Sequence, residues 1–133
     1  MLLPVIIVST SALAAGSEAE YWSRVMNAIV QVESNGDTRA TNGICAGPMQ
    51  ISPIVVKECN GIMEALKSKT RYTLADRFNL AKSKEMFLLI QSKYNPTRSI
   101  EQAVRTWNGG PDYSKKKTDR YYKKVMAEMK KQK

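Results

Sequence analysis

The chain has 133 residues and a formal net charge of +9, with 43% hydrophobic and 25% charged residues. These values are typical of one globular domain that is large enough to build its own core. The sequence contains no histidine, which excludes Ser-His-Asp and Cys-His catalysis and the histidine-based zinc sites. Two cysteines are too few for a structural zinc site. We therefore expect no metal and no cofactor, and any chemistry has to use carboxylates, hydroxyls and amides.

The first 15 residues form a separate segment. They carry no charged side chain, include the apolar run LLPVIIV and reach the small-residue sequence Ala12-Leu13-Ala14-Ala15. This pattern is typical of a secretory signal peptide cleaved near Ala14 or Ala15, and it is short for a transmembrane span. We therefore divide the chain into a signal peptide, residues 1–15, and a domain, residues 16–133, that is periplasmic or secreted. An uncleaved N-terminal anchor is the alternative, because no Lys or Arg precedes the apolar run.

An apolar stripe predicts a helix from about Glu18 to Ser34, which the pair Asn35-Gly36 then ends. The stripe consists of Trp22, Val25, Met26, Ile29 and Val32. Glu33 follows Ile29 by four residues and extends the stripe with a carboxylate where an apolar side chain belongs. At the edge of an apolar face its pKa should rise, as a general acid near neutral pH requires. The alternative is a surface glutamate in the last turn.

A polar loop leads from this helix to Gly47-Pro48-Met49-Gln50-Ile51. Gly47 permits a close backbone approach, and Met49 and Ile51 are core candidates. Gln50 between them is either a structural bridge or a ligand hydrogen-bonder, because a buried amide needs partners. Ser52-Pro53 then opens a second helix, with Asn60-Gly61 as a possible break or end.

The two cysteines, Cys45 and Cys59, enclose a short loop. A disulfide across it would suit an exported protein and would stabilise the fold by roughly 3 kcal/mol in the chain-entropy model. Two free buried thiols are the alternative, because the sequence gives no Cα separation.

Three further helices are predicted downstream. Thr73-Leu74-Ala75-Asp76 resembles a capping sequence before a long amphipathic helix that reaches about Tyr94. Ser99-Ile100-Glu101-Gln102 is a capping box that opens a short helix, which stops at Asn108-Gly109-Gly110-Pro111. The last helix begins at about Thr118.

The positive charge is concentrated near the end of this sequence. Between Lys115 and Lys133 there are nine Lys and Arg residues against Asp119 and Glu128. One interpretation is a solvated helix face, and the other is attraction to a polyanion. Because no nucleic-acid motif and no interleaving of aromatic and basic residues are present, we expect no nucleic-acid partner.

Four motifs in order resemble the soluble lytic transglycosylase family of the lysozyme-like superfamily. They are Glu33-Ser34, Gly47-Pro48-Met49-Gln50-Ile51, Ala103 to Pro111 with its Trp107-Asn108-Gly109-Gly110-Pro111 end, and Thr118-Asp119-Arg120-Tyr121. The resemblance extends from about Trp22 to Val125. Pro48 replaces the family's usual Leu, Trp107 replaces a Tyr, and Asp119-Arg120 departs from the start of the last motif. The loop between Glu33 and Gln50 is about one residue short.

The resemblance implies a mainly α, compact lysozyme-like domain with a substrate groove, acting as a monomer on peptidoglycan glycan strands. Glu33 would be catalytic. The implied substrate-binding residues are Gln50, Ser52, Asn108 and Tyr121. Among them, Tyr121 would orient Glu33, with Tyr122 as the fallback for that role.

The neighbours of these residues have structural roles in this interpretation. Ser34 would be a helix-end hydrogen-bonder, and Gly47 and Met49 would shape the site. Trp107 is assigned to the core rather than to a sugar face.

The implied reaction is cleavage of the β-1,4 bond between N-acetylmuramic acid and N-acetylglucosamine, with formation of a 1,6-anhydro ring. A hydrolytic lysozyme is the first alternative, with Asp37 as its second carboxylate, although Asp37 also fits a local turn. The second alternative is a non-catalytic wall-binding or secretion-apparatus component. An enzyme of this kind would suit a secretion or conjugation apparatus, a phage or general wall turnover.

Overall fold

The computed structural model describes the backbone of residues 3–132 and the side chains of residues 16–132. Within this span the chain is mainly helical, and its one sheet is a short antiparallel ribbon that pairs Thr41 with Ala46. The mainly α class predicted from the sequence is therefore confirmed. The elements are α1 (Leu3–Ser34), β1 (Thr41–Asn42), β2 (Cys45–Ala46), α2 (Pro53–Ala65), η1 (Leu74–Phe78), α3 (Leu80–Tyr94), α4 (Ile100–Gly109) and α5 (Lys115–Lys131).

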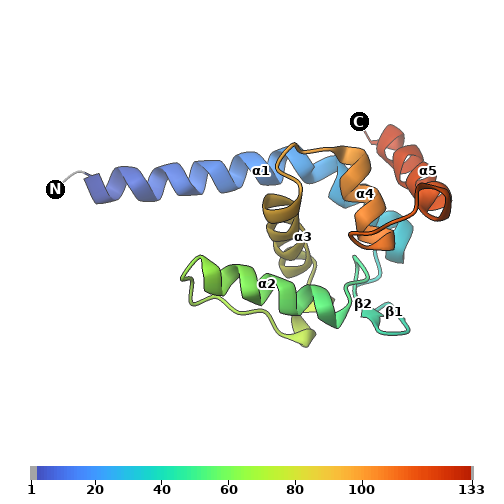
Figure 1. The fold of residues 1–133 in the computed structure, drawn as a ribbon, viewed down its shortest axis with the longest axis horizontal. Helices are drawn as coiled ribbons and strands as arrows, with labels where there is room; N and C mark the ends of the chain where they lie inside the picture. Colours follow the sequence, from blue (N-terminus) through green and yellow to red (C-terminus); the bar gives the residue numbers. More distant parts are fainter. Residues whose placement is uncertain (1–2, 133) are drawn as a thin grey trace.

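The first helix, α1, ends where the sequence predicts and begins earlier. It stops at Ser34 because Asn35 and Gly36 take left-handed conformations, with φ of 52° and 85°. It starts at Leu3 rather than near Glu18, and its N-terminal half projects away from the other elements (Figure 1). The predicted cleavage site near residues 14 and 15 involves side chains outside the described residues. Among the described residues, we find no helix with the length and apolarity that a membrane span requires.

The core lies between α1 and the helices that cover it. In Figure 1, α5 lies beside α4 and beside the C-terminal half of α1, while α2 packs against α3. The predicted stripe of α1 is buried from Trp22 to Ile29. Phe87 of α3 joins the two tryptophans, because its ring meets Trp22 at 5.6 Å and Trp107 at 5.1 Å between centroids, both edge-on.

Two predicted boundaries between α2 and α3 are also wrong. α2 does not break at Asn60-Gly61 but continues to Ala65. The amide of Asn60 instead makes two hydrogen bonds with the backbone of Tyr72, at 2.9 and 2.6 Å, and so fixes the loop after α2. The capping box at Thr73 is present, but it opens the short 3-10 helix η1, and α3 has its own cap at Asn79.

The last two helices begin at serine caps. Ser99 accepts a hydrogen bond from the backbone N–H of Gln102 at 3.1 Å, as the predicted capping box requires on that side. α5 starts at Lys115, three residues before the predicted start, because Ser114 caps it.

Candidate active site

Glu33 lies in the last turn of α1 and is half-buried. Burial removes water from the carboxyl group and raises its pKa from the ordinary value of 4.5 to about 7. The predicted position at the edge of the core and the predicted rise in pKa are both confirmed. At neutral pH a substantial fraction of Glu33 therefore carries a proton that it can donate.

Tyr121 of α5 is the hydrogen-bond partner of Glu33. Its phenol hydroxyl donates to Glu33 Oε2 at 2.9 Å, across 88 residues of chain. This bond favours the charged form and lowers the pKa of Glu33, against the larger effect of burial. In turn, burial and the nearby carboxylate raise the pKa of Tyr121 well above its ordinary value, so Tyr121 stays a donor. The fallback residue Tyr122 is not this partner, since its ring stacks under Arg105.

Ser34 connects the end of α1 to the Gly47–Ile51 segment. Its hydroxyl lies 2.8 Å from the carbonyl oxygen of Pro48 and 3.0 Å from that of Val30, and it accepts from the N–H of Gly36 at 3.2 Å. The predicted helix-end role of Ser34 is confirmed. Because Ser34 follows Glu33 directly and contacts Pro48, the Glu33-Ser34 motif and the Gly47–Ile51 motif lie next to each other.

Gly47 is packed directly against η1. It has a φ of +86°, and a Cβ built on it would overlap the carbonyl oxygen of Arg77. The Arg77 side chain in turn donates to the carbonyl oxygens of Ile44 at 3.0 Å and Ile51 at 3.2 Å. The close approach expected at Gly47 is confirmed. The Arg77 side chain also holds the two sides of this turn together, because it binds the backbone at both Ile44 and Ile51.

The nitrogen side of the Gln50 amide serves as a structural bridge between two backbone segments. Gln50 has a φ of +52°, and its Nε2 donates to the carbonyl oxygens of Gly47 at 2.8 Å and Ala40 at 3.0 Å. Its Oε1 atom is buried and has no hydrogen-bond partner among the described residues. A buried acceptor without a partner is costly, and among the described residues Oε1 of Gln50 is the one buried side-chain oxygen or nitrogen in this state.

The third motif meets the second through Trp107. The indole Nε1–H donates to the carbonyl oxygen of Met49 at 3.0 Å, and Met49 itself is fully buried. Trp107 is half-buried and packs against the core, as predicted. Asn108 follows it, exposed at the end of α4, and Ser52 is half-buried at the start of α2 without a side-chain capping bond.

Arg105 connects α4 to α5 and is 5% exposed. Its guanidinium donates to the carbonyl oxygen of Lys115 at 2.9 Å and to Thr118 Oγ1 at 3.0 Å. It also donates to Asp119 Oδ1 at 3.3 Å and lies 4.4 Å from the centre of the Tyr122 ring. Arg105 of α4 thus contacts four residues on one face of α5. α5 is also the helix that presents Tyr121 to Glu33.

Asp37, the second carboxylate considered for a lysozyme, is exposed and belongs to a turn. Its Oδ1 accepts from the N–H of Arg39 at 2.9 Å. This is the local role that the sequence favoured.

One cavity of about 420 Å³ lies along α1, α3 and α5 and is lined partly by Asn27, Gln31, Lys84 and Lys131. Glu33 is not among its lining residues, so the predicted substrate groove at Glu33 stays a prediction. Among the described residues, no cluster of three or more acidic or sulfur ligands is placed to hold a metal ion.

The two cysteines are not bonded to each other. Cys45 is half-buried and Cys59 is fully buried, with its Sγ 3.5 Å from the carbonyl oxygen of Met86. Burial, with a smaller effect of the neighbouring Glu58, raises the pKa of Cys59 to about 12. Of the two alternatives from the sequence, the structure contains free thiols.

The sequence did not single out Arg77 or Arg105. The partners of Arg77 are backbone carbonyls 26 and 33 residues away, which no side-chain pattern reveals. Arg105 follows Glu101 by four residues, which is the spacing of an ordinary exposed ion pair. Comparison of the chain with protein-family models, with curated proteins and with solved structures found no match.

Proposed function

We propose that this chain is a peptidoglycan lytic transglycosylase of lysozyme-like fold, with Glu33 as the sole catalytic carboxyl group. The observation that carries the proposal is the hydrogen bond of 2.9 Å between Tyr121 and Glu33. The motif resemblance selected these two residues from distant parts of the chain. A tyrosine that only filled a helix face would have no reason to meet that carboxylate.

The environment of Glu33 suits an acid that later acts as a base. With a pKa of about 7, the group can donate its proton to the glycosidic oxygen as the bond breaks. The carboxylate left behind can take the proton of the sugar's C6 hydroxyl, whose oxygen then bonds the anomeric carbon and closes the 1,6-anhydro ring. The substrate's acetamido group stabilises the positive anomeric carbon in this scheme, so one carboxyl group is enough.

The remaining candidates would position the sugar. Gln50 offers a buried Oε1 atom that has no partner among the described residues, and Asn108 offers an exposed amide beside Trp107. Ser52 offers a hydroxyl that is not used for capping. Because Asp37 is exposed and bonded within its own turn, the hydrolytic alternative has the weaker support. The proposed substrate places the protein in the periplasm or outside the cell.

The test is a digest of purified peptidoglycan with the wild type and with Glu33→Gln, read by mass spectrometry of the released muropeptides. We expect products one water lighter than hydrolytic products, with 1,6-anhydro ends, from the wild type alone. Glu20→Gln is the matched control, because Glu20 is an exposed glutamate of the same helix and should leave the products unchanged.

Two results would contradict the proposal. Reducing ends in place of anhydro ends would indicate a lysozyme and direct attention to Asp37. No release by a wild-type protein that is folded and binds peptidoglycan would indicate a wall-binding protein without this activity.

A further inference from the structure

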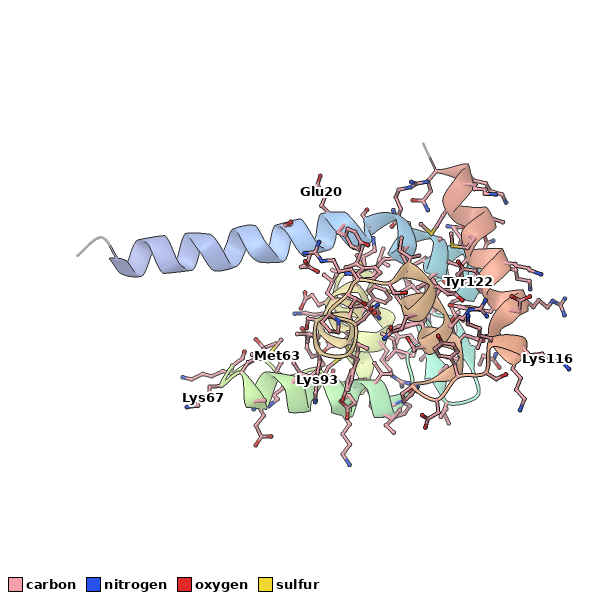
Figure 2. The ribbon with its side chains drawn as sticks, turned by 45° about the horizontal axis from the view of Figure 1, so that its top comes forward. Glu20, Met63, Lys67, Lys93, Lys116 and Tyr122 are labelled. Carbon is pink, nitrogen blue, oxygen red and sulfur yellow. The ribbon has the colours of Figure 1, made fainter. Side chains whose placement is uncertain are left out.

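The outward face of α5 carries seven cations and no acid. We call these residues the basic stripe: Lys116, Lys117, Arg120, Lys123, Lys124, Lys130 and Lys131, all exposed. Figure 2 shows Lys116 pointing away from the molecule, while Tyr122 of the same helix is turned toward it. From Lys116 to Lys131 the stripe is about 22 Å long, at the 1.5 Å rise per residue of an α-helix.

Most of the basic stripe has no counter-charge within the fold. Lys123 pairs with Asp119 at 3.0 Å, and Lys131 pairs with Glu128 at 3.0 Å. Five members have no ion-pair partner among the described residues, namely Lys116, Lys117, Arg120, Lys124 and Lys130. The two acids of α5 are half-buried at the edges of the stripe, so the outer face has a single sign.

This arrangement is unfavourable for an isolated helix. Lys116, Arg120 and Lys124 follow each other at intervals of four residues, and like charges at that spacing destabilise a helix. In addition, the first turn contains Lys115, Lys116 and Lys117 and no acid, although the helix dipole favours anions there. A solvated face usually mixes both signs. An external anion would relieve both sources of repulsion.

The composition of the stripe limits what that anion is. The only other residue on this exposed face is Ala127, while Tyr121 and Tyr122 are half-buried and pack against the core. Without an exposed aromatic or large apolar side chain, the stripe has nothing to stack on bases or to insert into a bilayer. A partner must therefore be held by charge, along a row that is one helix wide.

We propose that the basic stripe of α5 binds a linear phosphodiester polymer that lies along the helix. A single chain of phosphates matches a row of cations in shape, whereas a planar or double-helical partner would also require contacts beyond the acidic edges of the stripe. This proposal does not depend on the proposed function. Because Tyr121 occupies the inner face of the same helix, the polymer would bind without covering Glu33.

The experiment measures binding of the full chain to poly(glycerol phosphate) by isothermal titration calorimetry over a range of salt concentrations. The logarithm of the binding constant should fall linearly with the logarithm of salt concentration, because bound phosphates release their counterions. The triple variant Lys116→Gln, Arg120→Gln, Lys124→Gln should bind at least about tenfold more weakly, with a slope reduced by about 2.

The matched control is Lys57→Gln, Lys67→Gln, Lys69→Gln. These lysines are exposed and have no ion-pair partner among the described residues, and their replacement removes the same net charge. This variant should retain most of the affinity, and equal losses in the two variants would overturn the proposal by assigning the binding to net charge. Thermal unfolding of the stripe variant should be unchanged or shifted upward, because the substitutions remove repulsion. A lower midpoint would contradict that premise.

Two further arms test the identity of the partner. Phosphatidylglycerol vesicles and duplex DNA are titrated at the same phosphate concentration. Weaker binding to both than to the polymer supports the proposal. Tighter binding to vesicles would indicate a membrane surface, and tighter binding to DNA would indicate a nucleic acid, and either result would overturn the linear polymer. An absence of binding to all three would overturn the proposal as a whole.

Discussion

At the scale of the residue, Glu33 makes the stability of the fold depend on pH. Its pKa is raised from 4.5 to about 7 in the folded state, mainly by burial. Well below pH 4.5 the group is protonated in both the folded and the unfolded state, so it does not reduce the free energy of unfolding. Between these values the unfolded chain ionises first, so stability falls as pH rises and the loss is complete above about pH 7.

We expect Glu33→Gln to remove this pH dependence. A shift from 4.5 to about 7 corresponds to about 3 kcal/mol. The free energy of unfolding of the variant, relative to that of the wild type, should therefore increase by up to about 3 kcal/mol between pH 4 and pH 8. Urea denaturation across this range measures it, with Glu20→Gln as the control that should follow the wild type. A constant difference between Glu33→Gln and wild type would contradict the raised pKa.

Tyr121 is expected to hold the pKa of Glu33 down. Its hydroxyl bonds the carboxylate, so Tyr121→Phe should raise the pKa of Glu33 above about 7. Carbon-13 NMR titration of the glutamate carboxyl groups reports this directly. Tyr122→Phe is the matched control, because the neighbouring tyrosine contacts Arg105 and should leave the titration unchanged. A fall in the pKa of Glu33 on Tyr121→Phe would mean that water reaches the carboxyl group when the hydroxyl is lost.

At the scale of the element, the turn around Gly47 depends on the absence of a side chain. Gly47→Ala should destabilise the fold by more than about 3 kcal/mol, because a Cβ would overlap the backbone of Arg77 at a φ of +86°. Gly43→Ala isolates the backbone strain, since Gly43 has a φ of +61° with open space around it, and should cost about 1 kcal/mol. Thermal or urea unfolding compares them, and equal costs would show that the contact with Arg77 relaxes freely.

The arginine between α4 and α5 sets where the tyrosine of α5 lies. Arg105 contacts Lys115, Thr118, Asp119 and Tyr122 of α5, and a lysine cannot reproduce this planar fork. In an Arg105→Lys background, we therefore expect Tyr121→Phe to have little further effect on the pKa of Glu33.

The control for this double-mutant cycle is Arg24→Lys. Arg24 also joins α5, through the carbonyl oxygen of Met129 at 2.8 Å, but it is exposed. There Tyr121→Phe should keep its full effect in the carboxyl titration. An undiminished effect in the Arg105→Lys background would show that α1 alone positions the tyrosine.

Local signals predicted several ends of elements, although the Ser114 cap that starts α5 was missed, and long-range contacts limited the rest of the prediction. Ser34 with Asn35-Gly36, Ser52-Pro53 and the Ser99 cap are chemistry of neighbouring residues, and each was read correctly. Asn60 was misread as a possible turn residue because its partner is the backbone of Tyr72.

The same distinction between local signals and long-range contacts applies to the residues of the candidate site. The position of Glu33 followed from helix periodicity, and Tyr121 followed from the motif resemblance. Arg77 and Arg105 were missed because their partners are carbonyl oxygens and side chains of other elements. No residue spacing along the chain indicates those contacts.

At the scale of the whole molecule, the core formed by the described side chains begins at Trp22, and the N-terminal half of α1 projects away from the other elements in Figure 1. We expect a chain that starts at residue 16 to unfold at the same temperature as the full chain. Differential scanning calorimetry of the two forms tests this division of the chain. A fall of several degrees on removal of residues 1–15 would show that the segment belongs to the folded domain.

The pairing of α1 with α5 also has a consequence for how the molecule is made. A ribosome or an export channel delivers the chain from its N-terminus, so Glu33 emerges 88 residues before Tyr121. Until the chain folds, the carboxyl group is in water and loses its proton at neutral pH, as any glutamate does. The acid form is therefore acquired only when folding buries Glu33. A nascent chain therefore lacks the proposed general acid, and the proposed reaction can begin only after the chain has folded.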